Sequence, residues 1–156
     1  MSASGSRSRA SVVPVWLPPV CIAVSLAGAA VSAYLTVAHY TSPSILACSS
    51  TGLVSCEQVT TSQHSSVFGV PVALLGLLWF LGMAALVRPA AWRSDSRALT
   101  IVRPASVAAG IVFVLYLVWA ELFAIGAICL WCTVAHVLAF VLFGLVVWAS
   151  TAGEIE

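Results

Sequence analysis

Charge is what this sequence lacks most. Only 7% of its 156 residues are charged and none is lysine, whereas 62% are apolar and the mean hydropathy is +1.10. An ordinary soluble domain carries about 25% charged residues, so a water-soluble globule is excluded. Six arginines and five acidic residues leave a formal net charge of +1, too little to neutralise nucleic-acid phosphates. We therefore expect a protein whose partner is the lipid bilayer and which binds no nucleic acid.

The apolar residues gather in segments long enough to cross a membrane. Residues 16–38 and 67–87 each supply the roughly 20 uncharged residues that a spanning helix needs. Residues 105–149 form a further apolar run with Glu121 as its only charge. At about 1.5 Å per residue this run is about twice as long as the hydrocarbon core is thick. It must turn back, and we expect the turn near Gly126–Cys129, between spans at 105–127 and 130–149.

The predicted fold is therefore an all-α bundle of four transmembrane helices with a short outward loop between the first and second helix. Arg7 and Arg9 precede the first span, and the other four arginines lie between the second and third spans. Because basic residues favour the cytoplasmic side, we expect both termini in the cytoplasm. The first apolar stretch is too long for a cleaved signal peptide. We predict a single membrane domain over residues 14–150, between a disordered cytoplasmic tail at 1–13 and a short cytoplasmic tail at 151–156.

This topology divides the cysteines. Four of them fall at the outward face, namely Cys48, Cys56, Cys129 and Cys132, whereas Cys21 lies in the cytoplasmic half of the first helix and is interpreted as a packing residue. Disulfides persist outside the cytoplasm, where two pairs can be structural or redox-active. A four-thiolate zinc site is the competing chemistry, but an oxidising, hydrophobic surrounding disfavours it and we expect no metal. Four cysteines allow three pairings, and the spacing does not choose between them.

The C-x-x-C sequence at 129–132 favours redox chemistry. Its spacing puts both sulfurs on one face at the start of a helix, near the positive end of the helix dipole. The thiolate is favoured there, and the thiolate is the species that exchanges with disulfides. Two dithiols on one face can form a relay that takes electrons from outside. The sequence has no haem or flavin motif, so the electrons need a lipid-soluble acceptor, and a quinone meets that requirement.

Several motifs occur together along most of the chain. They are the C-x7-C pair at Cys48 and Cys56, Ser62 shortly after it, the sequence SVFGVP at 66–71, and YLVWAELFAIGAICLWC at 116–132. In these motifs the chain resembles the vitamin K epoxide reductase family. The short outward loop and the acidic residue in the third helix are similar to its bacterial branch, and we expect the form without the fused thioredoxin-like domain of some members.

The resemblance implies a disulfide-forming enzyme of the cytoplasmic (inner) membrane. Such an enzyme oxidises a separate thioredoxin-like or DsbA-like protein outside the cytoplasm and reduces a quinone of the menaquinone or ubiquinone type. In the family pattern Cys48 forms the mixed disulfide with the partner, Cys56 relays to Cys129, and Cys132 transfers electrons to the quinone. Ser65 and His136 replace an Asn and a Tyr of the animal enzymes. These departures argue against epoxide reduction, and a vitamin K epoxide or quinone reductase is the alternative within the family.

Six side chains are candidates for binding the quinone: Ser62, Ser65, Phe68, Glu121, Trp131 and His136. Serine hydroxyls can donate hydrogen bonds, aromatic rings can stack on a quinone ring, and His136 shares a helix face with Cys132. Each candidate also has a structural alternative. Glu121 and His136 could bond between helices, interfacial aromatics form belts without any ligand, and a serine before a helix is often its N-cap. Ser66 is the expected cap of the second helix.

Two other classes of function stay open at this stage. One is a small transporter that uses Glu121 as its ion-coupled carboxylate, and the other is a structural membrane protein with two disulfides. Neither class explains the C-x-x-C spacing.

Overall fold

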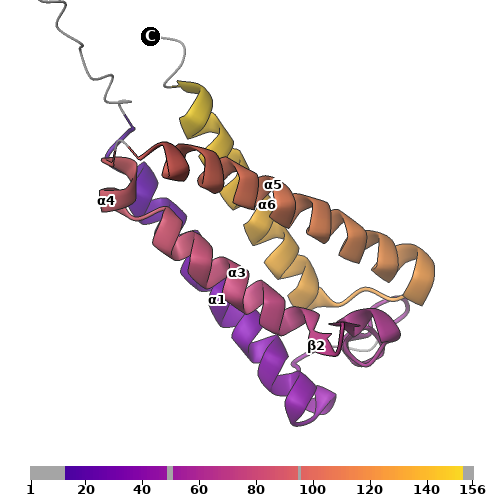
Figure 1. Ribbon diagram of the computed structural model, residues 1–156. Coiled ribbons are helices and arrows are strands. Elements are labelled where there is room, and N and C mark those ends of the chain that lie inside the picture. Colours follow the sequence, from indigo (N-terminus) through magenta and orange to yellow (C-terminus); the bar gives the residue numbers. More distant parts are fainter. Residues whose placement is uncertain (1–12, 49–50, 95, 153–156) are drawn as a thin grey trace, which may run out of the picture.

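The computed structural model describes residues 13–48, 51–94 and 96–152 and is mainly helical (Figure 1). The four long helices are α1 (Leu17–Tyr40), α3 (Val72–Leu86), α5 (Arg97–Trp119) and α6 (Leu130–Ala152). The short elements are η1 (Pro43–Ile45), α2 (Cys56–Thr60), η2 (Gln63–Ser65), β1 (Ser66–Val67), β2 (Val70–Pro71), α4 (Pro89–Trp92) and the π-helix η3 (Ala120–Ile125).

Three of the helical runs are long and apolar enough to cross a membrane. They are α1, the continuous run Arg97–Ile125 formed by α5 and η3, and the residues Leu130–Thr151 of α6. Helix α3 is equally apolar but has only 15 residues, which at about 1.5 Å per residue is shorter than a hydrocarbon core of about 30 Å. Within the described residues, three helices are therefore candidates for crossing a membrane, and a shorter apolar helix lies beside them.

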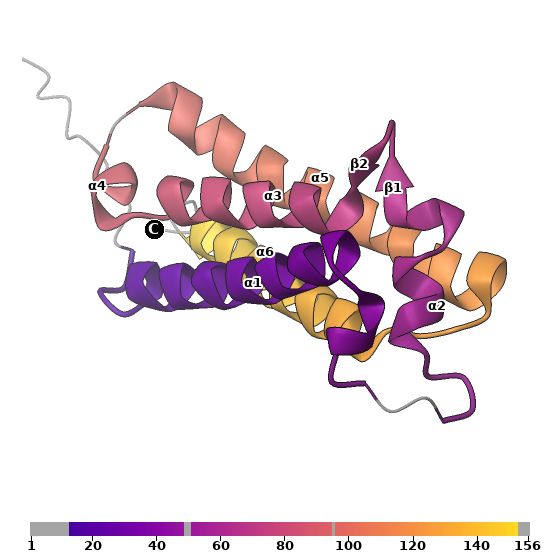
Figure 2. The same ribbon diagram turned by 90° about the horizontal axis from the view of Figure 1, so that it is seen from below.

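Helix α1 is the centre of the packing. It contacts α3 on one side and α6 on the other, while α5 packs mainly against α6. The start of α1, the helix α4 and the end of α6 lie at one end of the molecule, and α2 with the β1–β2 hairpin lies at the opposite end (Figures 1 and 2). The loop between the first and second spans and the turn near Gly126–Cys129, which are both predicted to face outward, therefore lie at the same end.

The second span was predicted to begin at residue 67, and the structure corrects this. Ser66–Val67 and Val70–Pro71 pair as a two-stranded antiparallel hairpin, whose turn places Phe68 and Gly69 at positive φ. Helix α3 begins only at Val72, with Pro71 at its N-cap. The predicted cap role of Ser66 is therefore wrong, because this residue is in strand β1.

The start of the third span differs from the prediction in the other direction, because its helix begins before the predicted residue 105. Helix α5 begins at Arg97 and passes through the buried Arg103. The Arg103 guanidinium donates to the carbonyls of Leu86 (3.0 Å) and Ala91 (3.0 Å), and lies 3.7 Å from the ring centroid of Trp92. A charge with its hydrogen bonds satisfied need not end a helix.

The predicted turn is present. After the π-helix the chain reverses at Gly126, which has φ 72° and ψ 22°, a left-handed conformation that glycine adopts at little cost. Helix α6 then starts at Leu130, as expected, and continues through Thr151–Ala152. Most of the predicted tail at 1–13 and the last four residues of the tail at 151–156 lie outside the described residues.

Candidate redox site

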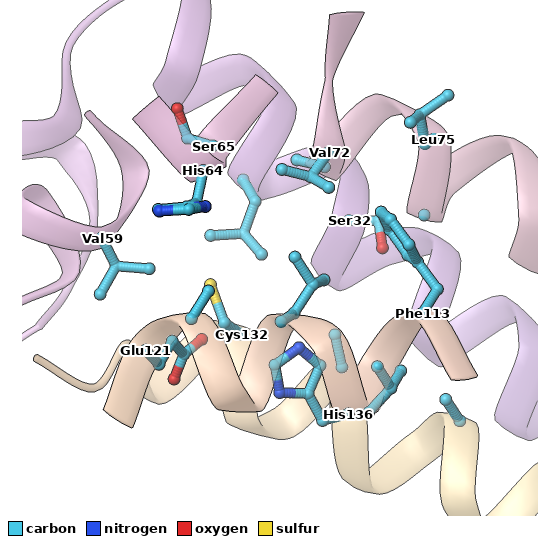
Figure 3. Close-up of a pocket in the computed structure, with 18 of the residues that line it drawn as sticks. Ser32, Val59, His64, Ser65, Val72, Leu75, Phe113, Glu121, Cys132 and His136 are labelled. Atoms are coloured by element: carbon cyan, nitrogen blue, oxygen red, sulfur yellow. The ribbon is translucent and has the colours of Figure 1, made fainter. Parts of the chain in front are cut away.

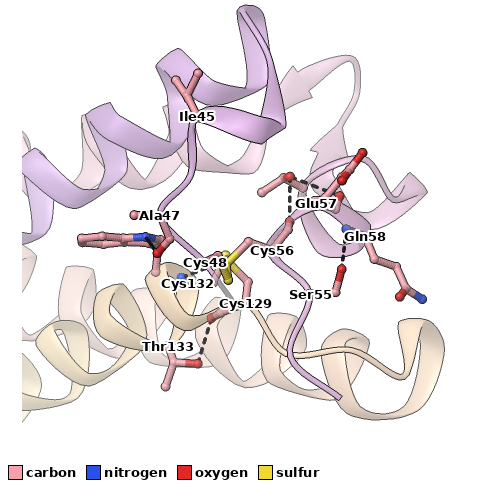
Figure 4. Close-up of a disulfide and its surroundings, with 12 residues drawn as sticks. Ile45, Ala47, Cys48, Ser55, Cys56, Glu57, Gln58, Cys129, Cys132 and Thr133 are labelled. Carbon is pink, nitrogen blue, oxygen red and sulfur yellow. Dashed lines mark hydrogen bonds between the residues drawn. A yellow bond between two sulfur atoms is a disulfide. The ribbon is translucent and has the colours of Figure 1, made fainter. Parts of the chain in front are cut away.

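A disulfide joins Cys48 and Cys56 in the segment between α1 and α3 (Figure 4). Their Cα atoms are 6.1 Å apart. Cys56 begins the short helix α2 and is buried, whereas Cys48 is partly exposed. Two of the four cysteines that are predicted to face outward are therefore joined to each other.

The C-x-x-C pair lies beside this disulfide. Cys129 is buried in the same apolar cluster as Cys56, and Cys48 and Cys132 pack against that cluster. Figure 4 shows the four side chains gathered where the start of α6 meets the loop. The loop disulfide and the C-x-x-C are thus next to each other at one end of the bundle.

Local hydrogen bonds favour the thiolate at Cys129. The Cys132 backbone N–H donates to the Cys129 sulfur at 3.3 Å, as expected for a cysteine just before a helix N-terminus. The hydrogen bond from the Cys132 side chain is the largest influence, and it lowers the pKa of the Cys129 thiol below its ordinary value of 9.0. Burial acts in the opposite direction but is the smaller effect.

Backbone contacts attach the Cys56 side of the loop to the turn before Cys129. The Ile128 N–H donates to the Leu53 carbonyl at 2.8 Å, and the Ser55 N–H donates to the Ile128 carbonyl at 3.1 Å. The side chain of Gln58 adds a hydrogen bond to the Ile125 carbonyl at 3.2 Å. These bonds hold the segment around Cys56 against the turn.

An apolar cavity of about 370 Å³ lies on the other side of Cys132. All four long helices contribute to its wall, together with residues of α2 and η2. This volume is within the range of small-molecule sites, which are mostly apolar with a few polar groups. The polar side chains in the lining include Ser62, His64, Ser65, Glu121 and His136, and Figure 3 shows the last four.

Among the described residues, the buried polar side chains in the lining of this cavity are Ser32, Glu121 and His136. Glu121 is only 5% exposed and His136 only 8%. Glu121 belongs to the π-helix η3, an irregularity that is frequent at functional sites. Its carboxyl group lies near the Cys129 backbone amide. His136 follows Cys132 by one helical turn on α6, and Figure 3 shows both side chains pointing into the cavity.

Ser62 and Ser65 also line the cavity, but their hydroxyls are already used locally. Ser62 Oγ donates to the Val59 carbonyl at 2.8 Å, and Ser65 Oγ donates to the Ser62 carbonyl at 2.7 Å. These bonds shape the turn around η2. Each hydroxyl oxygen can still accept a hydrogen bond from a ligand.

Two predicted quinone contacts lie away from the cavity. Phe68 is fully exposed at the hairpin turn. The Trp131 ring packs edge-on against Tyr34, and its Nε1–H donates to the Ala47 carbonyl at 3.3 Å. Neither side chain is part of the lining, because a position adjacent to a site residue in sequence faces another direction on a hairpin or a helix.

Sequence reasoning missed two residues of this region. His64 lines the cavity, and its Nδ1 is 3.1 Å from the Tyr116 hydroxyl. Tyr34 bonds to the loop near Cys48. By residue type alone, His64 and Tyr34 would be assigned to the membrane interface, because no local pattern marks a contact between distant segments.

An apolar cavity beside two cysteine pairs at the end of a bundle of membrane helices is the arrangement of a membrane oxidoreductase. Residues 19–147 match the Vitamin K epoxide reductase family, and the chain belongs to this family. Its members are membrane oxidoreductases that use quinones as substrates and work with a thiol redox partner. No curated protein matches the chain in a sequence comparison.

Proposed function

We propose that this protein is a disulfide-generating thiol:quinone oxidoreductase. It would oxidise a separate thioredoxin-like or DsbA-like protein outside the cytoplasm and reduce a membrane quinone of the menaquinone or ubiquinone type. The observation that carries this proposal is the position of the C-x-x-C pair. Cys129 shares a cluster with the loop disulfide, while Cys132 lines the apolar cavity.

Electrons would pass from the partner to the quinone through the four sulfurs. A partner thiolate attacks the partly exposed Cys48, and resolution of this mixed disulfide leaves the partner oxidised and the loop pair reduced. The Cys56 thiolate then attacks Cys129 and breaks the Cys129–Cys132 disulfide. Cys48 attacks Cys56, re-forms the loop disulfide and releases Cys129. The lowered pKa of the Cys129 thiol makes it a good leaving group.

The quinone would then reoxidise the C-x-x-C pair. Cys132 passes two electrons to the quinone, the Cys129–Cys132 disulfide re-forms, and the two thiol protons complete the quinol. A buried carboxyl beside the sulfurs supports Glu121 as a carrier for one of these protons. We assign a quinone contact to His136. The Ser62 and Ser65 hydroxyl oxygens, which already donate to carbonyls, would accept hydrogen bonds from the hydroxyl groups of the quinol product. Phe68 and Trp131 keep no direct contact in this proposal.

We also propose that the chain crosses the membrane four times. Helix α3 runs alongside α1 (Figure 2), and the adjoining hairpin adds length at its start. The arginine-rich connection between α3 and α5 would face the cytoplasm together with both termini. The protein would lie in the cytoplasmic (inner) membrane, with its four redox cysteines at the outward face.

The decisive experiment uses membranes that contain the full chain, reduced thioredoxin as the donor, and a short-chain ubiquinone or menaquinone as the acceptor. We expect quinone reduction by the unmodified protein and none by Cys132→Ser. Cys21→Ala, which changes a buried cysteine at the opposite end of the bundle, is the matched control and is expected to retain activity. Normal turnover by Cys132→Ser would reject the proposal.

Trapping the redox state of each cysteine separates the alternatives. We expect the C-x-x-C pair to become reduced when quinone is withdrawn. A structural protein would show no such change, and a transporter would keep its activity after loss of all four outward cysteines. An epoxide reductase would consume vitamin K epoxide in the same assay.

A further inference from the structure

Two aromatic side chains hold the segment that precedes Cys48. The Tyr34 hydroxyl donates to the Ile45 carbonyl at 2.7 Å and accepts from the Ala47 N–H at 3.1 Å. The Trp131 indole donates to the Ala47 carbonyl at 3.3 Å. The two rings meet edge to face with their centroids 5.0 Å apart. Both polar groups of the Ala47 backbone are therefore held by side chains from α1 and α6.

These contacts link the two redox pairs through their nearest neighbours. Ala47 directly precedes Cys48, and Trp131 directly precedes Cys132. The hydrogen bond between them ties the partly exposed loop cysteine to the helix that carries the C-x-x-C. Tyr34 reinforces this tie from α1.

The two sides of the loop are attached differently. The Cys56 side is held by backbone hydrogen bonds from Leu53 and Ser55 to Ile128. The Cys48 side is held by the side-chain bonds of Tyr34 and Trp131. Reopening of the loop disulfide would leave Cys56 attached to the turn before Cys129, so these two side chains determine where Cys48 lies.

We propose that Tyr34 and Trp131 form a clamp that positions Cys48 for electron transfer between the two cysteine pairs. This inference rests on the proposed function. When Cys56 is joined to Cys129 in a mixed disulfide, the Cys48 thiolate attacks Cys56 Sγ. The Cys48–Cys56 bond forms, the Cys56–Cys129 bond breaks, and Cys129 leaves as a thiolate. Two electrons have then moved from the loop pair to the C-x-x-C pair, and the clamp speeds this step by keeping Cys48 within reach.

The contacts favour this role over the two obvious alternatives. A belt tyrosine would direct its hydroxyl to the lipid headgroups, whereas the Tyr34 hydroxyl bonds to two backbone groups of the loop. A quinone-stacking tryptophan would line the cavity, whereas Trp131 packs on Tyr34 outside it. The side-chain hydrogen bonds of both residues go to the loop backbone and not to a reacting sulfur, so both are positioning residues.

The test removes the hydrogen bonds while it keeps aromatic rings in place. Membranes with the full chain are given dithiothreitol and a short-chain ubiquinone, quenched with acid, alkylated and analysed by mass spectrometry for the Cys56–Cys129 mixed disulfide. We expect its steady-state fraction to rise about fivefold in Trp131→Phe, the factor that corresponds to one lost hydrogen bond. The rise is expected to be larger in Tyr34→Phe, which loses two. Turnover should fall while the KM for the quinone is unchanged.

Matched controls separate positioning from general damage. Tyr40→Phe, at the exposed end of α1, and Trp148→Phe, stacked on Trp16 at the other end of the bundle, should both match the unmodified protein. Wild-type levels of the mixed disulfide in both clamp variants, together with wild-type turnover, would overturn the clamp and leave the proposed function intact. Absence of quinone reduction by the unmodified protein would instead reject the proposed function and the clamp together.

Hydrogen exchange provides a test that needs no substitution. The clamp predicts that the Ala47 amide of the unmodified chain exchanges more slowly than an unprotected amide, because Tyr34 accepts its hydrogen bond. Exchange at the unprotected rate would overturn the proposal even if a clamp variant fails to fold.

Discussion

The contacts around Cys129 favour its thiolate. The hydrogen bond from Cys132 lowers the pKa of its thiol, so the thiolate persists at lower pH than in an ordinary cysteine. We predict that alkylation of Cys129 by iodoacetamide in the reduced protein is half-maximal below pH 9.0, the ordinary value. Mass spectrometry of samples labelled across a pH series measures this midpoint.

The variant that tests this cause is Cys132→Ser. It replaces the thiol whose hydrogen bond has the largest effect on the Cys129 pKa with a hydroxyl, which is a weaker acid. We expect the Cys129 midpoint to move upward in this variant. An unchanged midpoint would mean that the helix N-terminus, rather than the neighbouring thiol, determines the ionisation of Cys129.

Glu121 provides the second prediction at this scale. Its carboxyl is buried beside the C-x-x-C pair, and Glu121→Gln keeps the shape while it removes proton transfer. We predict a fall in kcat of about a hundredfold, the lower end of general acid–base contributions, with the KM for quinone changed less than about threefold. Glu57→Gln, at an exposed carboxyl of α2, is the control. A kcat and pH profile equal to those of the unmodified enzyme would identify Glu121 as a purely structural group.

Single residues were predictable where their chemistry is rare in a membrane. Cysteines, one buried acid and one histidine stand out in an apolar sequence, and Cys132, Glu121 and His136 do meet at the cavity. Aromatic residues are common at interfaces, so their type carries little information. The contacts of Tyr34 and Trp131 with Ala47 depend on how α1, α6 and the loop pack, and no sequence spacing encodes that packing.

At the scale of elements, the reversal between the π-helix and α6 positions the C-x-x-C. Gly126 adopts φ 72° there, a conformation that costs an L-residue roughly 1 kcal/mol. We predict that Gly126→Ala lowers the unfolding free energy by about that amount, with a melting temperature several degrees lower in detergent.

Gly82 supplies the control for this substitution. It lies inside α3, and a Cβ added there would meet no atom within 4 Å. Gly82→Ala should leave the melting temperature unchanged or raise it, since alanine favours a helix more than glycine does. An equal fall in melting temperature in the two variants would indicate that any replacement of glycine destabilises the protein, whether or not the glycine is in the left-handed turn.

Element boundaries were less predictable than the elements themselves. An apolar run identifies material that can cross a membrane, but it does not distinguish a helix from a short hairpin within the run. Residues 66–71 are such a case, because Gly69 and Pro71 favour a turn although the hydropathy of the segment is high. The early start of α5 has a different cause. Arg103 interrupts the apolar run in the sequence, but in the structure carbonyls and the ring of Trp92 satisfy its charge, so the helix continues through it.

At the scale of the whole molecule, the two ends of the bundle differ in chemistry. Helices α2 and α4 lie at opposite ends (Figure 2). Helix α2 begins at Cys56 of the disulfide, whereas α4 is flanked by Arg88 and Arg93. Arginine side chains near a membrane favour the cytoplasmic side. The proposed orientation therefore depends on a few charges at one end, and it decides whether the cysteine pairs can meet an extracytoplasmic partner.

Labelling from outside tests this orientation. Thr61 and Ser94 are exposed residues at the opposite ends, so single substitutions Thr61→Cys and Ser94→Cys can report which end is accessible. We predict that a membrane-impermeant maleimide applied to intact cells labels Thr61→Cys and leaves Ser94→Cys unlabelled until the membrane is permeabilised. The reverse pattern would place the loop disulfide in the reducing cytoplasm, where such a bond does not persist, and the chain could not then generate disulfides for a protein outside. Labelling of both sites in intact cells would contradict a bundle whose two ends face opposite compartments.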